Sequence, residues 1–324
     1  MTTPYSVVIP THRRPETLFR VLEALGRQEG PPGFEVVVVD DGSGDSTSER
    51  LGAFRSAYPL RSFSQANSGP ARARNRGVAE SRGDVVVFLG DDTVPEPAFL
   101  AVHARAHAEH PTEPVAVLGY TTWPAERSVS PFLHHINEYG LQFGYALIED
   151  PDSVPFNFFY TSNISLPRRL LVEAGLFDTT FPHAAWEDIE LAYRLSKRGM
   201  KILYRPEAVA RHHHDVTFSS FRRRQERSGE AASIFFEKHP ELGEFLGVPQ
   251  ALTFSNGSGT TDRLRAAFAS LAQRWEIPGA RQALDRVLRD DYLRGLGRGL
   301  RARGWTATSG PGRRTERTTG VSRR

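Results

Sequence analysis

Two unbroken apolar runs in this chain each end in a pair of aspartates. Val36–Val39 leads directly into Asp40-Asp41, and Val85–Leu89 reaches Asp91-Asp92 after a single glycine. Apolar runs of this length are typical of strands that are covered on both faces of a parallel sheet. Because the carboxyl ends of parallel strands form the ligand crevice of an open α/β sheet, we expect these aspartates to meet there. Such a crevice favours a divalent cation and a phosphorylated ligand, and therefore nucleotide chemistry.

Strand-like and helix-like segments alternate as far as residue 120 or so. The expected strands are Tyr5–Ile9, Phe34–Val39, Val85–Leu89 and Val115–Leu118. One expected helix begins at Pro15, and two others cover 47–57 and 67–83. A fourth is headed by Pro95 and Pro97 and runs through Ala108. This order predicts an α/β fold with a mostly parallel central sheet whose two faces are covered by helices.

The second half of the chain is less regular. Residues 121–155 are rich in aromatic side chains and carry no clear period, so we expect an excursion from the sheet over a pocket. The elements expected after it are a strand over Tyr160–Leu166, helices from Pro167 and Trp186, a strand pair over Lys201–Arg211 and a helix from Thr217.

A small helical unit is expected near the C-terminus. Asn256–Gly259 has the composition of a linker, and apolar residues recur at helical spacing around Phe268 and around Leu288. Residues 306–324 are rich in Gly, Ser, Thr and Arg, for which disorder is expected. The predicted division is an α/β domain over 1–240, with halves 1–120 and 121–240, a helical region over 241–305 and a disordered basic tail over 306–324.

The composition excludes several kinds of site. The chain has no cysteine, so disulfides, thiolate zinc sites and cysteine nucleophiles are excluded, and any metal must be held by oxygen or imidazole. No apolar run approaches the roughly 20 residues that span a bilayer, and no leader segment is recognisable, so we expect a cytoplasmic protein. From Arg294 onward the arginines greatly outnumber the single acid Glu316, but no nucleic-acid recognition motif accompanies them, and we expect no nucleic-acid partner.

Asp92, His212 and His214 are the candidate metal ligands. A divalent cation that is held by only one or two carboxylates keeps coordination positions open for phosphate oxygens. In an extended segment alternate side chains face the same way, so His212 and His214 are expected to point together while His213 points away. The alternative is that the aspartates cap the following helix and the histidines merely end a polar strand.

Two further segments have both a functional and a structural interpretation. Trp186-Glu187-Asp188 opens a helix, and Asp188 is the candidate general base for an acceptor hydroxyl, although a well-capped helix start explains Glu187 by itself. Between Asn67 and Gly77, arginines alternate with small residues. This stretch is either a solvated basic face or a helix whose Arg74 contacts a diphosphate.

Taken together, these segments resemble the family 2 glycosyltransferases over roughly residues 4–240. The resemblance is carried by motifs in the family's order: Val7–Thr11, Val39–Ser43, Asn67–Gly77, Phe88–Asp92, Thr161–Ser165, Gly175–Asp178 and Trp186–Leu195. It implies the GT-A fold, a Rossmann-like three-layer α/β/α arrangement, here with a C-terminal helical extension. It also implies an inverting reaction, in which an acceptor hydroxyl attacks the anomeric carbon of a nucleotide sugar. One departure is Gly90, which stands where the family's DXD motif has its first acid.

The resemblance implies roles for individual residues as well. Asp188 is the expected catalytic base, and Asp92 the expected ligand of a divalent cation, Mn²⁺ or Mg²⁺. The donor is expected to be a nucleotide-diphosphate sugar, with UDP as the first choice of nucleotide and GDP or TDP as alternatives. The acceptor is expected to be a hydroxyl of a sugar, a lipid-linked glycan or a small molecule, as in polysaccharide biosynthesis. The donor-binding residues are expected to be Pro10, Thr11, Arg13, Asp40, Asp41, Asn67, Gly69, Arg74 and Asp91. The acceptor-binding residues are expected to be Asn163, Trp186 and Glu187.

Other functions are compatible with parts of the sequence. A sugar-phosphate nucleotidyltransferase also has a nucleotide-binding sheet, but it needs a glycine-rich, lysine-bearing loop where this chain has Thr11–Arg14. A catalytically inactive module that binds nucleotide or glycan is a second alternative, against which the retention of Asp92 and Asp188 argues. The basic amphipathic segment Tyr292–Leu300 suggests either peripheral contact with the inner face of an anionic membrane or a packing helix with a solvated tail. The sequence leaves a homodimer open.

Overall fold

The computed structural model describes residues 4–254, 267–268, 271 and 279–306. The chain divides into two compact units: Met1–Val129 with Ile136–Asp215, and Ser130–His135 with Val216–Arg324. The predicted linker at Asn256–Gly259 and nearly all of the predicted tail lie outside the described residues, as does most of the helix expected around Phe268. The functional halves expected within 1–240 stay predictions.

The first unit is built on a mixed sheet with the strand order β3-β2-β1-β4-β7-β6-β8-β5. The strands β3, β2, β1 and β4 are mutually parallel, β7 is antiparallel to its neighbours β4 and β6, and β5 is antiparallel to β8. The strand bounds are β1 Tyr5–Thr11, β2 Phe34–Asp40, β3 Leu60–Ser64, β4 Val85–Leu89, β5 Thr93–Pro95, β6 Val115–Thr122, β7 Asn163–Pro167 and β8 Lys201–His212.

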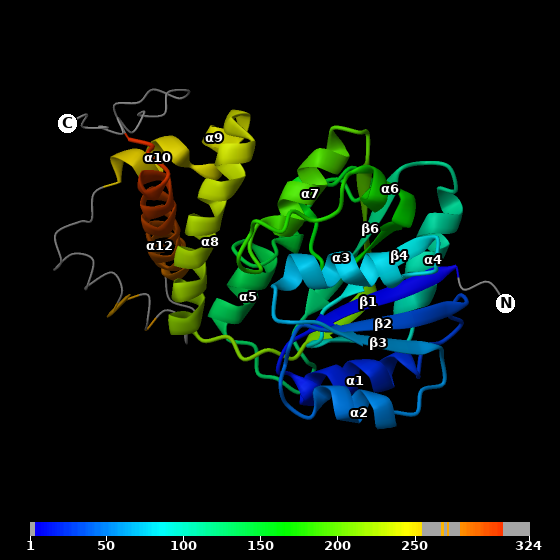
Figure 1. Ribbon diagram of the computed structural model, residues 1–324. Coiled ribbons are helices and arrows are strands. Elements are labelled where there is room, and N and C mark those ends of the chain that lie inside the picture. The colour runs from blue at the N-terminus through cyan, green and yellow to red at the C-terminus, as the bar shows by residue number, and fades with distance from the viewer. Residues whose placement is uncertain (1–3, 255–266, 269–270, 272–278, 307–324) are drawn as a thin grey trace, which may run out of the picture. The chain divides into compact units, whose positions relative to one another are not determined.

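Helices cover both faces of this sheet (Figure 1). One face packs against α1, α2 and α4, and the other packs against α3, α6 and α7. Val36 and Val38 of β2 point to the first layer while Val37 and Val39 point to the second, which is why these four residues form an unbroken apolar run. The predicted three-layer α/β/α fold is therefore confirmed. The helix bounds are α1 Pro15–Leu25, α2 Thr47–Ala53, α3 Pro70–Glu80, α4 Phe99–Glu109, α5 Pro131–Glu138, α6 Arg168–Glu173 and α7 Glu187–Ser196.

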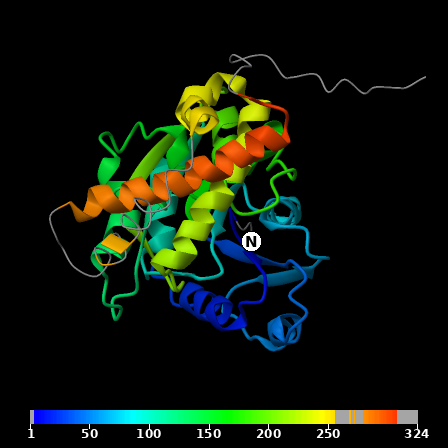
Figure 2. The same cartoon turned by 90° about the vertical axis from the view of Figure 1, so that its left-hand side faces the viewer.

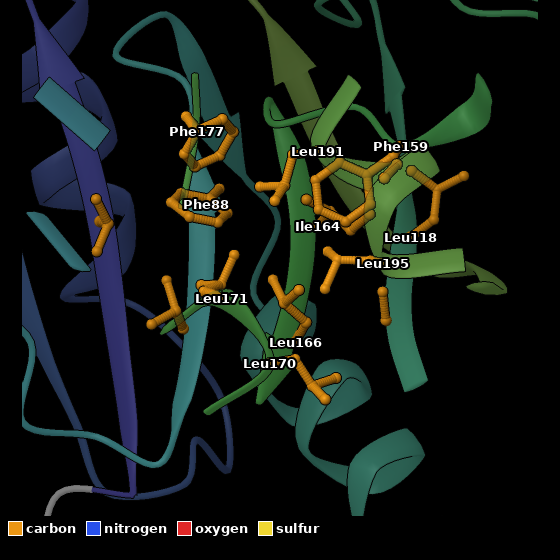
Figure 3. Packing of buried hydrophobic residues seen from close by; sticks show 14 of the residues in the cluster. Phe88, Leu118, Phe159, Ile164, Leu166, Leu170, Leu171, Phe177, Leu191 and Leu195 are labelled. Carbon is orange, nitrogen blue, oxygen red and sulfur yellow. The ribbon is translucent and has the colours of Figure 1, made fainter. Parts of the chain in front are cut away.

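The layer beneath α3, α6 and α7 contains the larger of the two apolar clusters (Figure 3). Phe88 of β4 meets Phe177 edge-on, with ring centroids 5.2 Å apart. Ile164 of β7 and Leu191 of α7 are fully buried in the same cluster. Burial on this scale, at about 25 cal/mol per Å² of apolar surface, ties the start of α7 to the centre of the sheet.

Several elements differ from the sequence-based expectation. The strands β3 and β5 and the helix α5 were not predicted, and the segment 201–212 is one long strand rather than a strand pair. Pro95 ends β5 instead of heading a helix, and α4 begins only at Phe99. Proline is tolerated in β5 because a short strand at the sheet's edge leaves its missing N–H unused.

The second unit is helical within the described residues. Its long helices are α8 Phe218–Lys238 and α12 Ala280–Ala302, accompanied by the short α9 Gly243–Leu246 and α10 Val248–Thr253. The helices α8 and α12 lie side by side (Figure 2). Glycines allow this approach, since a Cβ at Gly295 would lie 1.9 Å from the Glu226 carbonyl oxygen.

The apolar face of α12 is buried inside this unit. Leu293, Leu296 and Leu300 are each at most 7% exposed. The sequence left two alternatives for this segment, membrane contact or a packing helix, and this burial corresponds to the packing helix. Within the described residues no helix is both long enough and apolar enough to cross a membrane.

A matched pair of glycines tests the packing of the first unit. A Cβ at Gly77 of α3 would lie 2.3 Å from Val8 Cγ1 of β1, whereas no heavy atom lies within 4 Å of a Cβ at Gly52 of α2. We expect Gly77→Ala to lower the free energy of unfolding by roughly 1–3 kcal/mol through overpacking. Gly52→Ala should raise it by up to ~1 kcal/mol through helix propensity. Urea unfolding measures both, and equal midpoints for the two variants would contradict this packing.

Candidate active site

Three parallel strands deliver polar side chains to one edge of the sheet. Thr11 at the end of β1 pairs in register with Asp40 at the end of β2, and the Asp41 N–H donates to the Thr11 carbonyl oxygen at 2.9 Å. The Thr11 hydroxyl reaches across to β4 and donates to Asp91 Oδ2 at 2.8 Å. The carboxylates predicted from the two apolar runs therefore do meet in one place.

The carboxylates that follow β2 are buried and fully engaged. Asp40 accepts hydrogen bonds from the Ser43 N–H and the Ser48 hydroxyl, at 3.0 and 2.8 Å. Asp41 accepts from the backbone N–H groups of Ser68 and Gly69, at 2.9 and 2.8 Å.

The Asp41 carboxylate also accepts from the Gln65 amide at 2.7 Å, and the Asn67 amide donates to the Asp41 carbonyl at 3.1 Å. Asp41 thus fixes the loop that leads into α3. Gly69 has a φ of 88°, a left-handed conformation that favours glycine, and this brings its N–H onto the carboxylate.

Arg14 closes over the carboxylates that follow β4. Its Nη1 lies 2.5 Å from Asp92 Oδ2 and 3.2 Å from Asp91 Oδ1. Burial and the neighbouring charge of Asp92 raise the pKa of Asp91 to about 6, against the opposing charge of Arg14. Burial alone would raise the pKa of Asp92 too, but His212, Arg14 and His214 outweigh it, and the pKa of Asp92 is lowered. Asp92 therefore carries the firm negative charge of the pair.

The pairing of β5 with β8 brings two imidazoles to Asp92. Thr93 lies opposite His212 in this antiparallel pair, and the His213 N–H donates to the Asp92 carbonyl at 2.7 Å. His212 Nε2 is 3.5 Å from Asp92 Oδ1, and His214 Nδ1 is 3.8 Å from Asp92 Oδ2. Both rings face Asp92, as the alternation of an extended segment predicts.

A stack of rings steadies these histidines. Trp123, which is buried, stacks on His212 with centroids 5.7 Å apart, and His212 stacks in turn on His214 at 5.6 Å. The Arg127 guanidinium lies over the Trp123 ring, 5.2 Å from its centroid. The stack limits rotation of both imidazoles, which is the preorganisation that a ligand site needs.

The donor set fits a divalent cation in kind, but the described residues do not yet gather around one. Carboxylate oxygens suit Mn²⁺ and Mg²⁺ alike, and the imidazoles favour the transition metal Mn²⁺ over Mg²⁺. No three His, Asp or Glu side chains in the described part of the chain stand close enough together to hold a metal ion. The Gln142 amide supports the fit: its nitrogen lies 3.2 Å from His212 Nδ1 while its buried Oε1 has no partner. Turning this amide over would let Oε1 accept from Nδ1–H and leave the lone pair of Nε2 facing Asp92.

An ion pair between two distant segments stands beside the first turn of α7. Arg74 Nη1 of α3 donates to Glu187 Oε1 at 2.7 Å; the Glu187 side chain is buried and the Arg74 side chain is 11% exposed. Arg74 Nε and Glu187 Oε2 have no partner, nor has the buried hydroxyl of Ser162. Buried orphans of this kind mark a place where a polar ligand or water is accommodated.

Asp188 has a raised pKa and contacts that fix its position, as a general base requires. Burial raises its pKa to about 7, the charge of Glu187 adds to the rise and Arg74 opposes it. The Ile189 N–H donates to Asp188 Oδ1 at 2.9 Å, and the Thr161 hydroxyl lies 3.5 Å from Oδ2. Trp186 enters the helix with a φ of 72°, a strained conformation for this residue type, of the kind that clusters at functional sites.

A backbone contact joins Asp188 to the aspartate pair. The Gly90 N–H, two residues before Asp92, donates to the Ser162 carbonyl at 3.3 Å. Thr161, next to Ser162, contacts Asp188. The candidate base and the candidate cation ligand are thus held in one frame of β4, β7 and α7.

The structure does not bring every predicted residue to the site. Asn163 is 0% exposed, and its side chain bonds His103 Nε2 and the carbonyls of Tyr120 and Ala208. It therefore ties strands together and is not available to an acceptor, which corrects the expectation for this residue. Arg13 points away from the aspartate pair: its backbone N–H and Nε bond the hydroxyl and the carbonyl of Ser43.

Sequence reasoning missed Arg14 and Gln65. The chain offers adjacent arginines, and the expectation chose Arg13. The signal for Arg14 was its place directly before Pro15, because the residue before the first turn of α1 lies at the carboxyl edge of the sheet. No comparable sequence signal identifies Gln65, which reaches Asp41 from the end of β3.

Comparisons with known proteins identify the family of this chain. The family model described as glycosyl transferase family 2 matches residues 6–161, and the one described as glycosyl transferase family group 2 matches residues 85–238. Two validoxylamine A glucosyltransferases of Streptomyces hygroscopicus, from subsp. limoneus and subsp. jinggangensis, are 31% and 30% identical to this chain. Each alignment covers 80% of the chain, which spans 62% and 67% of the two relatives' lengths.

A solved structure shares the fold. The mannosyltransferase PcManGT from Pyrobaculum calidifontis, in complex with GDP-Man and Mn²⁺, superposes with a TM-score of 0.59. The match covers 90% of this chain and 87% of the mannosyltransferase, at 19% sequence identity. At this level of identity the superposition shows that the two chains share a fold.

The raised pKa of Asp188 predicts a pH dependence of stability. An unfolded aspartate titrates near pH 4, whereas Asp188 in the folded chain titrates near pH 7. The folded state therefore holds an extra proton between these values, and the contribution of Asp188 to stability falls as the pH rises from about 4 to 7. We expect Asp188→Asn to be more stable than the wild type by on the order of 2 kcal/mol at pH 8, with a much smaller difference at pH 5. Urea unfolding at both pH values measures this, and a difference that does not change with pH would contradict it.

Proposed function

The chain belongs to glycosyl transferase family 2, and on that premise we propose that it is an inverting enzyme that moves a sugar from a nucleotide-diphosphate donor to an acceptor hydroxyl. The observation that carries the proposal is the single frame that holds Asp188, with its raised pKa, and the Asp91-Asp92 pair. A nucleotide-binding module without catalysis has no need for a buried carboxylate that titrates near neutral pH.

The donor lies along the carboxyl ends of β1, β2 and β4 in this proposal. Thr11, Asp40 and Asp41 surround the position of the nucleoside, and the Asp41 carboxylate keeps the loop before α3 in place. The diphosphate lies toward Asp91 and Asp92. The mannosyltransferase that shares the fold is in complex with GDP-Man, so GDP stands beside UDP among the first nucleotides to test here.

Proton transfer is assigned to Asp188. Its carboxylate accepts the proton of the acceptor hydroxyl as the hydroxyl oxygen forms a bond to the anomeric carbon. The bond between the anomeric carbon and the diphosphate oxygen breaks on the opposite side, and its electron pair leaves with the nucleoside diphosphate. Attack from the face opposite the leaving group inverts the anomeric configuration.

Asp92, His212 and His214 would hold the divalent cation. When bound, a cation there neutralises the charge that develops on the departing diphosphate. Arg74 and Glu187 contribute by fixing the first turn of α7 against α3, so that Asp188 faces the donor side of the sheet. Their buried atoms Arg74 Nε and Glu187 Oε2 have no hydrogen-bond partner and would be satisfied by a polar ligand or water that reached them.

Donor hydrolysis tests the proposal with water in place of the acceptor. We expect one member of a panel of UDP-, GDP- and TDP-sugars to be hydrolysed in the presence of Mn²⁺ or Mg²⁺. Asp188→Asn should keep donor affinity within about twofold while its turnover falls by roughly 10²–10⁴-fold, the usual effect of losing a general base. Asp84→Asn is the matched control, since Asp84 is exposed and precedes β4 at the opposite end of that strand.

Two outcomes would contradict the proposal. If no nucleotide sugar binds, the donor site is wrong. If a sugar nucleotide binds but the wild type never turns it over with any tested acceptor or with water, the chain is a binding module. Turnover by Asp188→Asn at the wild-type rate would remove the role of Asp188 alone.

A further inference from the structure

The Arg14 guanidinium supplies positive charge to the Asp91-Asp92 pair. It bridges Asp91 and Asp92, at 3.2 and 2.5 Å, and both carboxylates are about one tenth exposed. The pair carries two acidic groups in a buried setting, which is unfavourable unless positive charge is supplied. In the described structure Arg14 makes the closest contact to that pair, nearer than either imidazole.

A divalent cation and the guanidinium compete for the negative charge of Asp92. Arg14 holds Oδ2, the oxygen nearest His214, while Oδ1 faces His212 Nε2 at 3.5 Å, so a cation seated between Asp92 and the two imidazoles would lie beside the guanidinium. Two positive groups on one carboxylate repel each other strongly where water is largely excluded. Binding of the cation therefore favours the departure of Arg14.

The structure allows Arg14 to move without unfolding anything. Its side chain is 44% exposed, and although the Arg14 carbonyl accepts the Leu18 N–H as the N-cap of α1, the side chain makes no capping hydrogen bond. A long arginine side chain at such a position changes rotamer on a fast timescale. The donor's diphosphate offers it a new partner, because guanidinium binds phosphate oxygens with two parallel hydrogen bonds.

We propose that Arg14 is the resident counter-cation of the Asp91-Asp92 pair and passes to the diphosphate when donor and cation bind. This inference rests on the proposed function and deepens it. It makes cation affinity depend on the donor: without nucleotide, the cation competes with Arg14, and with nucleotide the competitor is drawn away. Arg14 is in this account a positioning residue that couples the two ligands.

Electron paramagnetic resonance of free Mn²⁺ tests the coupling without any activity measurement. Wild type, Arg14→Gln, Arg72→Gln and Asp92→Asn are each titrated with Mn²⁺, first alone and then with the best-binding diphosphate among UDP, GDP and TDP. Arg72 is an exposed residue of α3, so Arg72→Gln controls for the loss of one positive charge. Thermal melting confirms folding, and Arg14→Lys, which keeps the charge, provides a second variant at the same position.

Without nucleotide, we expect Arg14→Gln to bind Mn²⁺ roughly tenfold more tightly than the wild type, the effect of removing one half-exposed ion pair. Arg72→Gln and Arg14→Lys should stay within about threefold of the wild type, and Asp92→Asn should lose binding. Adding the nucleotide should tighten Mn²⁺ binding more in the wild type than in Arg14→Gln.

Two results separate the possible failures. If Asp92→Asn weakens Mn²⁺ binding while Arg14→Gln binds no more tightly than the wild type, the role of Arg14 is overturned and the cation site stands. If Asp92→Asn binds Mn²⁺ like the wild type, the cation site of the proposed function is itself wrong, and the inference falls with it.

Discussion

The electrostatic requirement of buried carboxylates organises this end of the molecule. Asp40, Asp41, Asp91 and Asp92 are each at most 7% exposed, and each must be matched by donors or positive charge. Backbone N–H groups, hydroxyls and amides donate to Asp40 and Asp41. The Thr11 hydroxyl, the Arg14 guanidinium and the imidazoles pair with Asp91 and Asp92. The loops after β1, β2 and β3 and the end of β8 are therefore held in place by the same groups that would bind a charged ligand. A ligand that brings its own phosphate charge and a cation replaces one set of partners by another without leaving a buried charge unmatched.

A second constraint connects α3, β4 and α7 within the first unit. The Arg74–Glu187 ion pair spans segments that are far apart in the sequence, and the Gly90–Ser162 hydrogen bond joins β4 to the segment before β7. Breaking one partner of a buried pair leaves an uncompensated charge, so these contacts resist separation. Their consequence is that Asp188 keeps a fixed relation to β4. An in-line displacement needs such a relation, because base, anomeric carbon and leaving group must align.

Much of this arrangement follows from the sequence, and the exceptions have physical reasons. β1, β2 and β4 are predictable because both of their faces are covered and each contains an unbroken apolar run. β3 was not predicted because it is an edge strand with half-exposed residues. β5 was not predicted because three residues are too few to show a period. The choice between Arg13 and Arg14 depends on the direction of the chain as it enters α1, which adjacent identical residues cannot reveal. Asn163 belongs to a matching motif, yet only the packing shows that neighbouring strands consume its amide. The roles of the site residues remain predictions that experiments must test.

The central claim is that the Asp91-Asp92 pair is a cation and diphosphate site that Arg14 holds in the absence of donor. A crystal structure with bound nucleotide diphosphate and Mn²⁺, recorded with anomalous scattering at the manganese edge, tests it most directly. The account predicts an anomalous peak within bonding distance of an Asp92 carboxylate oxygen, with Arg14 turned to the diphosphate. A nucleotide bound elsewhere, or a manganese peak away from Asp92 with Arg14 still bridging both aspartates, would contradict it.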